Sequence, residues 1–211
     1  MPKDIHRLLV GKWEDGTRPK DVYALYVSKE PEAYLDTVIH GIESPEARVR
    51  SGCTELASFL AEDHPTLIYP FVDLFLNNLD SKEPVVRWEA VCTLGNLEVA
   101  DKQHKIPPAI KRILPNLRHE SIVLQVHSVR ALSKIARANP ERGAEILDAL
   151  IGAADAFPGN RVGFIIEAME YFVEAKPLLP KVRAFVESHL KSDVSVVVAK
   201  AKKMLKRIPS G

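Results

Sequence analysis

Three glutamates share one helical face and are the side chains best spaced for acid–base chemistry. Glu167, Glu170 and Glu174 stand at i, i+3 and i+7, which places their carboxyl groups on the same side of a helix. Two carboxylates held close together can act as general acid and general base. Their helix is the first of a helical pair, however, and its outer side is expected to face water. We therefore favour a solvated acidic face over a catalytic pair.

The seven histidines do not form a metal-binding pattern. They stand at positions 6, 40, 64, 104, 119, 127 and 189, with no pair at the spacing of ligands on one helix and no cysteine pair nearby. The chain has no Gly-x-Gly-x-x-Gly sequence, no phosphate-binding loop and no elbow-like motif around a serine or cysteine. We expect no metal, no cofactor and no catalytic residues.

The two tryptophans invite separate interpretations. Trp88 follows Arg87 in an amphipathic stretch but lies on a different face from Val86 and Ala90. It either fills the junction between neighbouring helical units or stands partly exposed as a binding anchor, and the sequence leaves both open. Trp13 lies in a glycine-bounded loop that could fold over the N-terminal end of the structure.

The charge balance counts against a dedicated nucleic-acid-binding protein. The 29 basic and 28 acidic residues give a net charge of +1, whereas such proteins usually have a clear basic excess. With only two cysteines, Cys53 and Cys92, a disulfide framework is not expected, and reduced thiols point to the cytoplasm. No apolar run approaches the roughly 20 residues that span a bilayer, and the first residues lack the apolar core of a signal peptide.

The elements that must position these side chains form a repeat of about 37 residues. Apolar or small residues recur at spacings of four, four and three, as at Val86, Ala90, Leu94 and Leu97, which predicts one buried face of a helix. The pattern occurs over residues 49–60, 86–97, 124–135, 161–172 and 197–208. Each copy is followed by a break and a second amphipathic stretch, so the predicted unit is a helical hairpin.

Serines and prolines suggest where these helices begin. Ser44 and Ser81 precede a proline and acidic residues, and we predict them as N-caps. Pro70, Pro115 and Pro180 fall early in, or inside, the second stretches, which predicts a kink or a late helix start at each.

The sequence predicts two parts of unequal size. Residues 1–18 form an N-terminal cap helix and loop, and residues 19–211 form a single continuous repeat domain of about five hairpins. The last helix, over 194–208, has a lysine-rich outer side, as a terminal repeat needs a polar face where no neighbour covers it.

The repeat resembles the HEAT family of helical-hairpin solenoids. The signature is a turn with proline or acidic residues, then Val-Arg, then a small residue, and it stands most fully over residues 80–97 and nearly as well over 44–60. The resemblance implies an all-α, right-handed superhelical solenoid whose second helices line the concave face. In such repeats an arginine often pairs with an acidic turn residue, and only Arg50 and Arg87 occupy that position here.

This resemblance implies a non-enzymatic scaffold or adaptor that binds a partner protein or peptide on its concave face. The non-core residues of the second helices alternate in charge, which suits a protein partner better than a phosphate backbone. The candidate partner-binding residues are Asp73, Asn77, Lys111, Arg112, Asp148, Lys181 and Arg183. The oligomeric state is left open.

Two alternatives remain. Nucleic acid could bind through basic residues of the second helices and the last helix, namely Lys102, Lys105, Lys111, Arg112, Arg118 and the lysines after residue 199. A HEAT-like DNA glycosylase is the more distant alternative, since it would need Trp88 and an acidic side chain to face one cleft.

Overall fold

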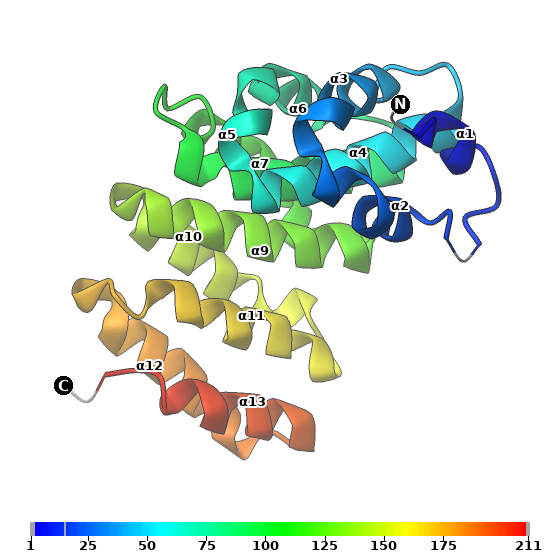
Figure 1. Cartoon of the computed structure of the whole chain (residues 1–211). Coiled ribbons are helices and arrows are strands. Elements are labelled where there is room, and N and C mark those ends of the chain that lie inside the picture. The colour runs from blue at the N-terminus through cyan, green and yellow to red at the C-terminus, as the bar shows by residue number, and fades with distance from the viewer. Residues whose placement is uncertain (1–2, 15, 210–211) are drawn as a thin grey trace. The chain divides into compact units, whose positions relative to one another are not determined.

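A computed structural model describes residues 3–14 and 16–209. Over these residues the chain is helical, with α-helices joined by short 3₁₀ segments and no strand (Figure 1). The chain divides into two compact units, one ending at Ile106 and the other beginning at Pro107, and each is described by itself.

The N-terminal unit is a short cap followed by helical hairpins. Its α-helices are α1 (Ile5–Leu9), α2 (Pro19–Leu25), α3 (Pro31–Gly41), α4 (Ala47–Asp63), α5 (Pro65–Ile68), α6 (Val72–Asn78) and α7 (Pro84–Leu97). The 3₁₀ segments are η1 (Val27–Lys29), η2 (Tyr69–Phe71) and η3 (Glu98–Ala100). The long helices α4 and α7 lie side by side and form the main contact of this unit (Figure 1).

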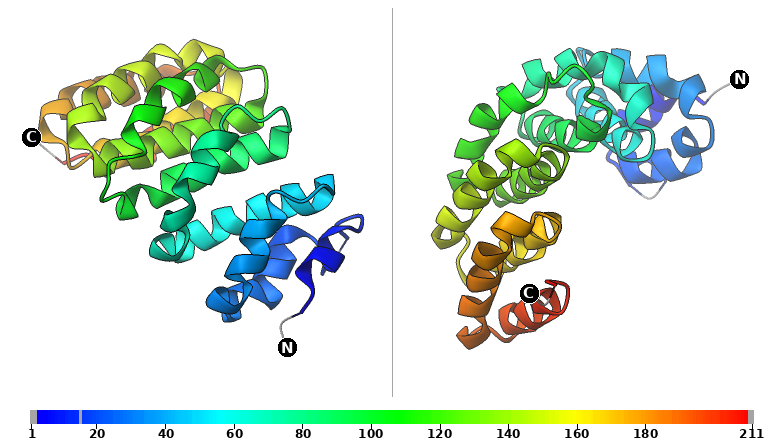
Figure 2. Two further views of the ribbon diagram at one scale, coloured as in Figure 1. Left: turned by 90° about the horizontal axis from the view of Figure 1, so that it is seen from above. Right: turned by 90° about the vertical axis from the view of Figure 1, so that its left-hand side faces the viewer.

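The C-terminal unit continues the pattern and ends in a single helix. Its α-helices are α8 (Ile110–Ile113), α9 (Ile122–Ala138), α10 (Pro140–Gly152), α11 (Val162–Ala168), α12 (Leu179–Ser188) and α13 (Ser195–Leu205). The 3₁₀ segments are η4 (Pro107–Ala109), η5 (Leu114–Arg118), η6 (Ala154–Ala156), η7 (Gly159–Arg161), η8 (Met169–Phe172), η9 (Lys176–Leu178) and η10 (His189–Lys191). Helix α9 packs on α10 and on α11, and α13 packs on α11 and α12 (Figure 2).

The repeated apolar positions form the core, as the spacing predicts. Val86, Ala90, Leu94 and Leu97 of α7 are all buried. Removing one such leucine side chain from water contributes about 1.5–3 kcal/mol. Cys53 occupies the position in α4 that corresponds to Ala90 in α7. It also has no exposed surface, so the small residue at this position of the repeat is buried in both helices.

Two glycines let helices of the N-terminal unit approach closely. A Cβ atom on Gly41 would lie 2.3 Å from the Cys53 sulfur, and one on Gly52 would lie 2.8 Å from a methyl group of Leu9. Both distances are shorter than van der Waals contact. The α3–α4 and α1–α4 contacts therefore depend on glycine at these positions.

Prolines shorten the second helices as predicted. Pro70 lies in η2 and Pro115 in η5, so each stands in a 3₁₀ turn between helical segments. Pro180 is the second residue of α12, which is a late helix start. The second helices are interrupted or start late because proline has no amide hydrogen to donate within a helix interior.

The predicted N-caps were wrong. Helix α4 begins after Glu46 and α7 after Glu83, two residues beyond Ser44 and Ser81. Each serine hydroxyl instead accepts a hydrogen bond of 3.2 Å from the amide of that glutamate. The serines therefore belong to the turn that precedes each helix. Pro45 and Lys82, which follow the serines, also lie outside the helices.

The N-terminal cap is held by Trp13 and Arg48. The Trp13 indole N–H donates to the Leu9 carbonyl at 2.7 Å, and the Arg48 guanidinium lies 5.8 Å from the centre of the indole ring. Arg48 also donates to the Gly11 carbonyl at 2.8 Å. The loop therefore folds back on α1, as predicted, and Arg48 ties it to α4. The boundary at residue 18 and the single continuous domain remain predictions.

Candidate functional site

The second-helix candidates of the N-terminal unit are Asp73 and Asn77 on α6. Asp101 accepts hydrogen bonds from the amides of Lys105 and Ile106 at 3.0 and 2.8 Å and thereby shapes the loop after α7. This loop brings the Lys105 ammonium to 2.6 Å from the Asp73 carboxylate. Asn77 is exposed. The sequence placed Asp73 at the surface, but its partner comes from the next repeat and was missed.

The C-terminal unit repeats this arrangement. The Lys181 ammonium of α12 forms an ion pair with Asp148 of α10, the preceding second helix. Arg183 donates to the Pro209 carbonyl at 3.0 Å and lies 3.7 Å from the Glu187 carboxylate. Asp73–Lys105 and Asp148–Lys181 thus join residues 32 and 33 positions apart, so each pair links neighbouring repeats.

Asp73, Asp148, Lys181 and Arg183 therefore have ion-pair or hydrogen-bond partners within the chain. Lys111 and Arg112 of α8 are exposed. Among the described residues, no ion pair or side-chain hydrogen bond holds Lys111 or Asn77. These two side chains are the ones most available to a partner.

Three of the basic residues considered for nucleic acid, Lys105, Arg118 and Lys200, form ion pairs with carboxylates of this chain. Arg118 donates to both carboxylate oxygens of Asp155, at 2.7 and 3.0 Å, and this hydrogen bonding lowers the pKa of Asp155. Lys105 is paired with Asp73, and Lys200 lies 3.0 Å from Glu167. A continuous positive track would need these charges free.

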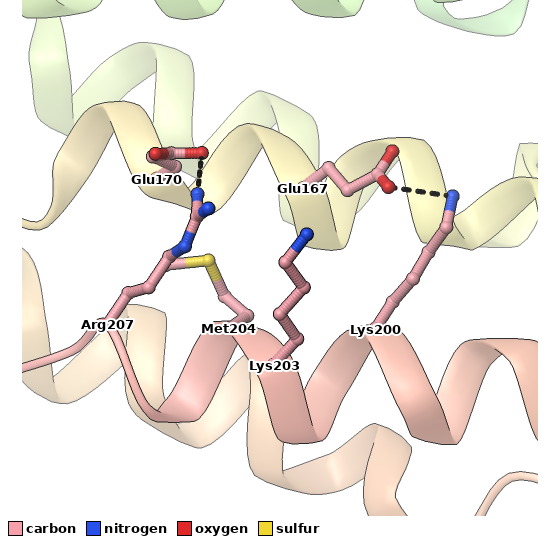
Figure 3. Close-up of a pocket in the computed structure, with 6 residues that line it drawn as sticks. All are labelled: Glu167, Glu170, Lys200, Lys203, Met204 and Arg207. Atoms are coloured by element: carbon pink, nitrogen blue, oxygen red, sulfur yellow. Dashed lines mark ion pairs between the residues drawn. The ribbon is translucent and has the colours of Figure 1, made fainter.

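Two of the three glutamates considered first form ion pairs, and the third, Glu174, is exposed. Glu167 of α11 pairs with Lys200 of α13, and Glu170 of η8 pairs with Arg207 in the turn after α13 (Figure 3). Their side chains are about half exposed, so water also reaches them. The sequence could not place α13 beside α11, and these two ion pairs were missed.

A small cleft lies between these two ion pairs. It has a volume of about 260 Å³ and is lined by Glu167, Glu170, Lys200, Lys203, Met204 and Arg207 (Figure 3). The cleft lies wholly within the C-terminal unit. Three of these residues, Lys200, Lys203 and Arg207, were interpreted from sequence as part of a polar terminal cap, and nothing in their spacing indicated a cleft.

A buried carboxylate lies at the contact of α4 and α7. Glu89 is 7% exposed and accepts a hydrogen bond of 3.0 Å from the Trp88 indole. Burial, followed by the nearby Glu55 carboxylate, raises the pKa of Glu89 to about 7, although hydrogen bonds from Ser58 and Trp88 act to lower it. Burial also raises the pKa of Glu55. Trp88 itself is half-buried.

Glu89 was missed because a glutamate in an amphipathic helix is ordinarily expected on the exposed side. Its one sequence signal is its place directly before the buried Ala90. A carboxylate beside an indole can bind a cation or hold a proton, but here the indole N–H already bonds to Glu89. The hydrogen bond between Trp88 and Glu89 is therefore assigned a structural role at the α4–α7 contact.

Metal and membrane sites have no support among the described residues. No three histidine, cysteine or acidic side chains there come close enough together to hold a metal ion. His127 is mostly buried, and burial together with the nearby Arg130 lowers its pKa to about 4. Over the same residues, every helix is too short or too polar to cross a bilayer.

Comparison with solved structures identifies the fold. A designed armadillo repeat protein matches 97% of this chain and 98% of its own, with a TM-score of 0.67 and 15% identity. The chain has the armadillo/HEAT-like helical-repeat fold. An engineered protein matches this repeat protein over 99% of its length and 100% of its own, with a TM-score of 0.68 and 18% identity.

A further match is one of a set of computationally designed armadillo repeat proteins for modular peptide recognition. It covers 97% of this repeat protein and 90% of its own chain, with a TM-score of 0.60 and 15% identity. No protein-family model and no curated protein matches the sequence. The all-α solenoid predicted from the repeat is confirmed.

Proposed function

We propose that this repeat protein is a non-enzymatic protein-interaction scaffold. Its partner is a protein or peptide that binds the face lined by the second helices, which the HEAT resemblance makes the concave face. The candidate residues on this face are Asp73, Asn77, Lys111, Arg112, Asp148, Lys181 and Arg183. The proposal places the protein in the cytoplasm, in keeping with two cysteines, Cys53 and Cys92, that form no disulfide bond.

The observation that carries the proposal is the charge pattern of the second helices. Ion pairs between neighbouring repeats hold Asp73 and Asp148 at the surface, where both carboxylates stay more than half exposed. Lys111 and Arg112 add exposed positive charge in α8. A surface of mixed and ordered charges gives a partner specificity and orientation rather than only attraction. The designed relatives of this fold that recognise peptides support the same function.

A selection from a peptide library against the immobilised protein, followed by binding of the selected peptides to variants, tests the proposal. The double variant Lys111→Glu, Arg112→Glu should weaken these peptides at least tenfold, because charge reversal on the binding face costs more than loss of charge. The matched control Lys202→Glu, Lys206→Glu reverses two exposed charges at the C-terminal end of α13 and should change affinity less than twofold. Circular dichroism checks that both variants keep their helices.

Two results would count against the proposal. Equal affinity of the selected peptides for the double variant and for wild type would remove the second helices from the binding face. Retention of a nucleic acid from lysate, lost on nuclease treatment and unmatched by any selected peptide, would put the nucleic-acid alternative first.

A further inference from the structure

We infer that the cleft between α11–η8 and α13 binds the carboxylate side chain of an acidic segment in a partner protein. The inference rests on the proposed function for the kind of ligand, a peptide, but it concerns a different surface. The cleft is lined by residues of α11, η8, α13 and the turn after α13, and none of them is among the candidates on α8, α10 and α12.

The charges around the cleft do not cancel. Three cations line it, Lys200, Lys203 and Arg207, against two carboxylates. Lys200 is paired with Glu167 and Arg207 with Glu170, at the two ends of the cleft. Lys203 extends between these pairs towards α11 (Figure 3) and, among the described residues, has no ion-pair partner. The cleft therefore carries one positive charge in excess, centred on Lys203.

The walls of the cleft are held in place. A Cβ atom on Gly163 would lie 2.7 Å from the Lys200 side chain, so the lysine stem packs directly on the backbone of α11. The Lys200 ammonium also lies 5.1 Å from the centre of the Phe164 ring. Met204 is 4% exposed and forms an apolar floor. A ligand therefore meets a largely preformed site, which lowers the entropy cost of binding.

The size and charge of the cleft select the ligand. Its volume of about 260 Å³ lies just below the roughly 300–1,000 Å³ of pockets for drug-sized molecules, so a single side chain fits better than a cofactor. The methylene groups of a glutamate can lie on Met204 while its carboxylate reaches Lys203. A phosphate dianion fits less well, because it carries twice the charge and faces Glu167 and Glu170.

Fluorescein-labelled hexaglutamate is the probe, with hexaglutamine as the uncharged control. Binding is measured by fluorescence anisotropy at about 0.15 M salt, where attraction between distant exposed charges is largely screened. Lys203→Gln should weaken hexaglutamate binding at least fivefold, since it removes the one uncommitted ammonium. The matched control Lys202→Gln removes an exposed lysine one position away and should change affinity less than twofold.

The ¹³C-labelled methyl group of Met204 reports whether the ligand enters the cleft. Hexaglutamate should shift its NMR signal more than that of the Met169 methyl group, which is fully buried in η8 and does not line the cleft. Lys203→Arg should retain both the binding and the shift. These readouts require only that the variants keep their circular dichroism spectrum.

Three outcomes would overturn the inference. Absence of hexaglutamate binding would mean that the cleft does not attract carboxylates. An equal loss of hexaglutamate affinity in Lys202→Gln and Lys203→Gln would mean that the attraction is diffuse. An equal Met204 shift with inorganic phosphate would mean an unselective anion site. The peptides selected for the second-helix face test the proposed function separately, so either idea can fail while the other stands.

Discussion

At the scale of single residues, Glu89 is a carboxylate in an unusually buried environment. It lies at the α4–α7 contact with little access to water, next to a second carboxylate, Glu55. Its pKa is raised to about 7 from an ordinary value near 4.5. The folded state therefore binds a proton more tightly than the unfolded chain does, and folding depends on pH through this group.

Glu89→Gln should stabilise the protein at high pH. Between about pH 4.5 and 7 the folded state retains a proton that the unfolded chain loses, so wild type loses stability as pH rises through this window. A shift of this size corresponds to up to about 3 kcal/mol. Urea unfolding at pH 8 should show the variant more stable than wild type, with the difference vanishing near pH 4.5.

The exposed Glu141→Gln on α10 controls for the loss of one charge and should show no such pH-dependent difference. A Glu89→Gln difference that is the same at pH 4.5 and pH 8 would contradict the pKa assigned to Glu89.

Gly41 offers a second test at this scale. An added methyl group would overlap the Cys53 sulfur, so Gly41→Ala should destabilise the fold by about 1–3 kcal/mol. Gly152, also the last residue of a helix, has open space around its Cβ position. Gly152→Ala should therefore stabilise by roughly 0.5 kcal/mol. Denaturant midpoints measure both, and equal effects at the two positions would refute the close contact of α3 and α4.

At the scale of elements, the terminal helix α13 depends on one face. Val197, Ala201 and Met204 are buried against the preceding helices, while the other side of α13 faces water. Repeat proteins owe their stability largely to contacts between neighbouring units. Damage to this face is therefore expected to stay local.

Met204→Ala should loosen α13 without loosening the N-terminal unit. Loss of a buried methionine costs about 2–5 kcal/mol, which is large for a helix held on one side. Hydrogen exchange should show lost amide protection over 195–205 and unchanged protection over 84–97. Lys206→Ala, on the exposed side, should leave both segments unchanged. Equal loss of protection in α7 would show that the two segments unfold together.

The helices could be predicted from sequence where their burial repeats locally. The spacing of Val86, Ala90 and Leu94 identifies α7 because each position depends only on its own helix. The N-caps were missed because both Ser44 and Glu46 accept amide hydrogens near the start of α4, and their order depends on turn geometry. The partners Asp73 and Lys105 lie 32 residues apart, so their ion pair follows from stacking of repeats and leaves no local pattern.

The cleft beside α13 shows the same limit. Lys200, Lys203 and Arg207 follow helical spacing, and so do Glu167 and Glu170. Their opposition follows only from the packing of α13 on α11. The sequence therefore predicted two charged faces correctly as surfaces, but it could not predict that they meet.

At the scale of the whole molecule, the predicted single continuous domain can be tested with the natural tryptophans. Trp13 and Trp88 both lie in the N-terminal unit, so fluorescence reports on that unit, whereas circular dichroism reports on helices of both. If the chain unfolds as one domain, the two signals should give coincident urea transitions. Separated midpoints would show that the units unfold independently. Trp88→Phe serves to separate the signal of the cap from that of α7.

The spacing of the surface ion pairs has a consequence for engineering. Asp148 and Lys181 lie in successive repeats. Exchanging the two residue types keeps the ion pair and leaves the net charge unchanged, while it reverses the direction of the local electric field. Asp73 and Lys105 allow the same exchange in the other unit. Two exchanges, made singly or together, give four versions of the chain, counting the unchanged one. The order of charges on these exposed helices can therefore be changed by substitution without altering the buried core residues.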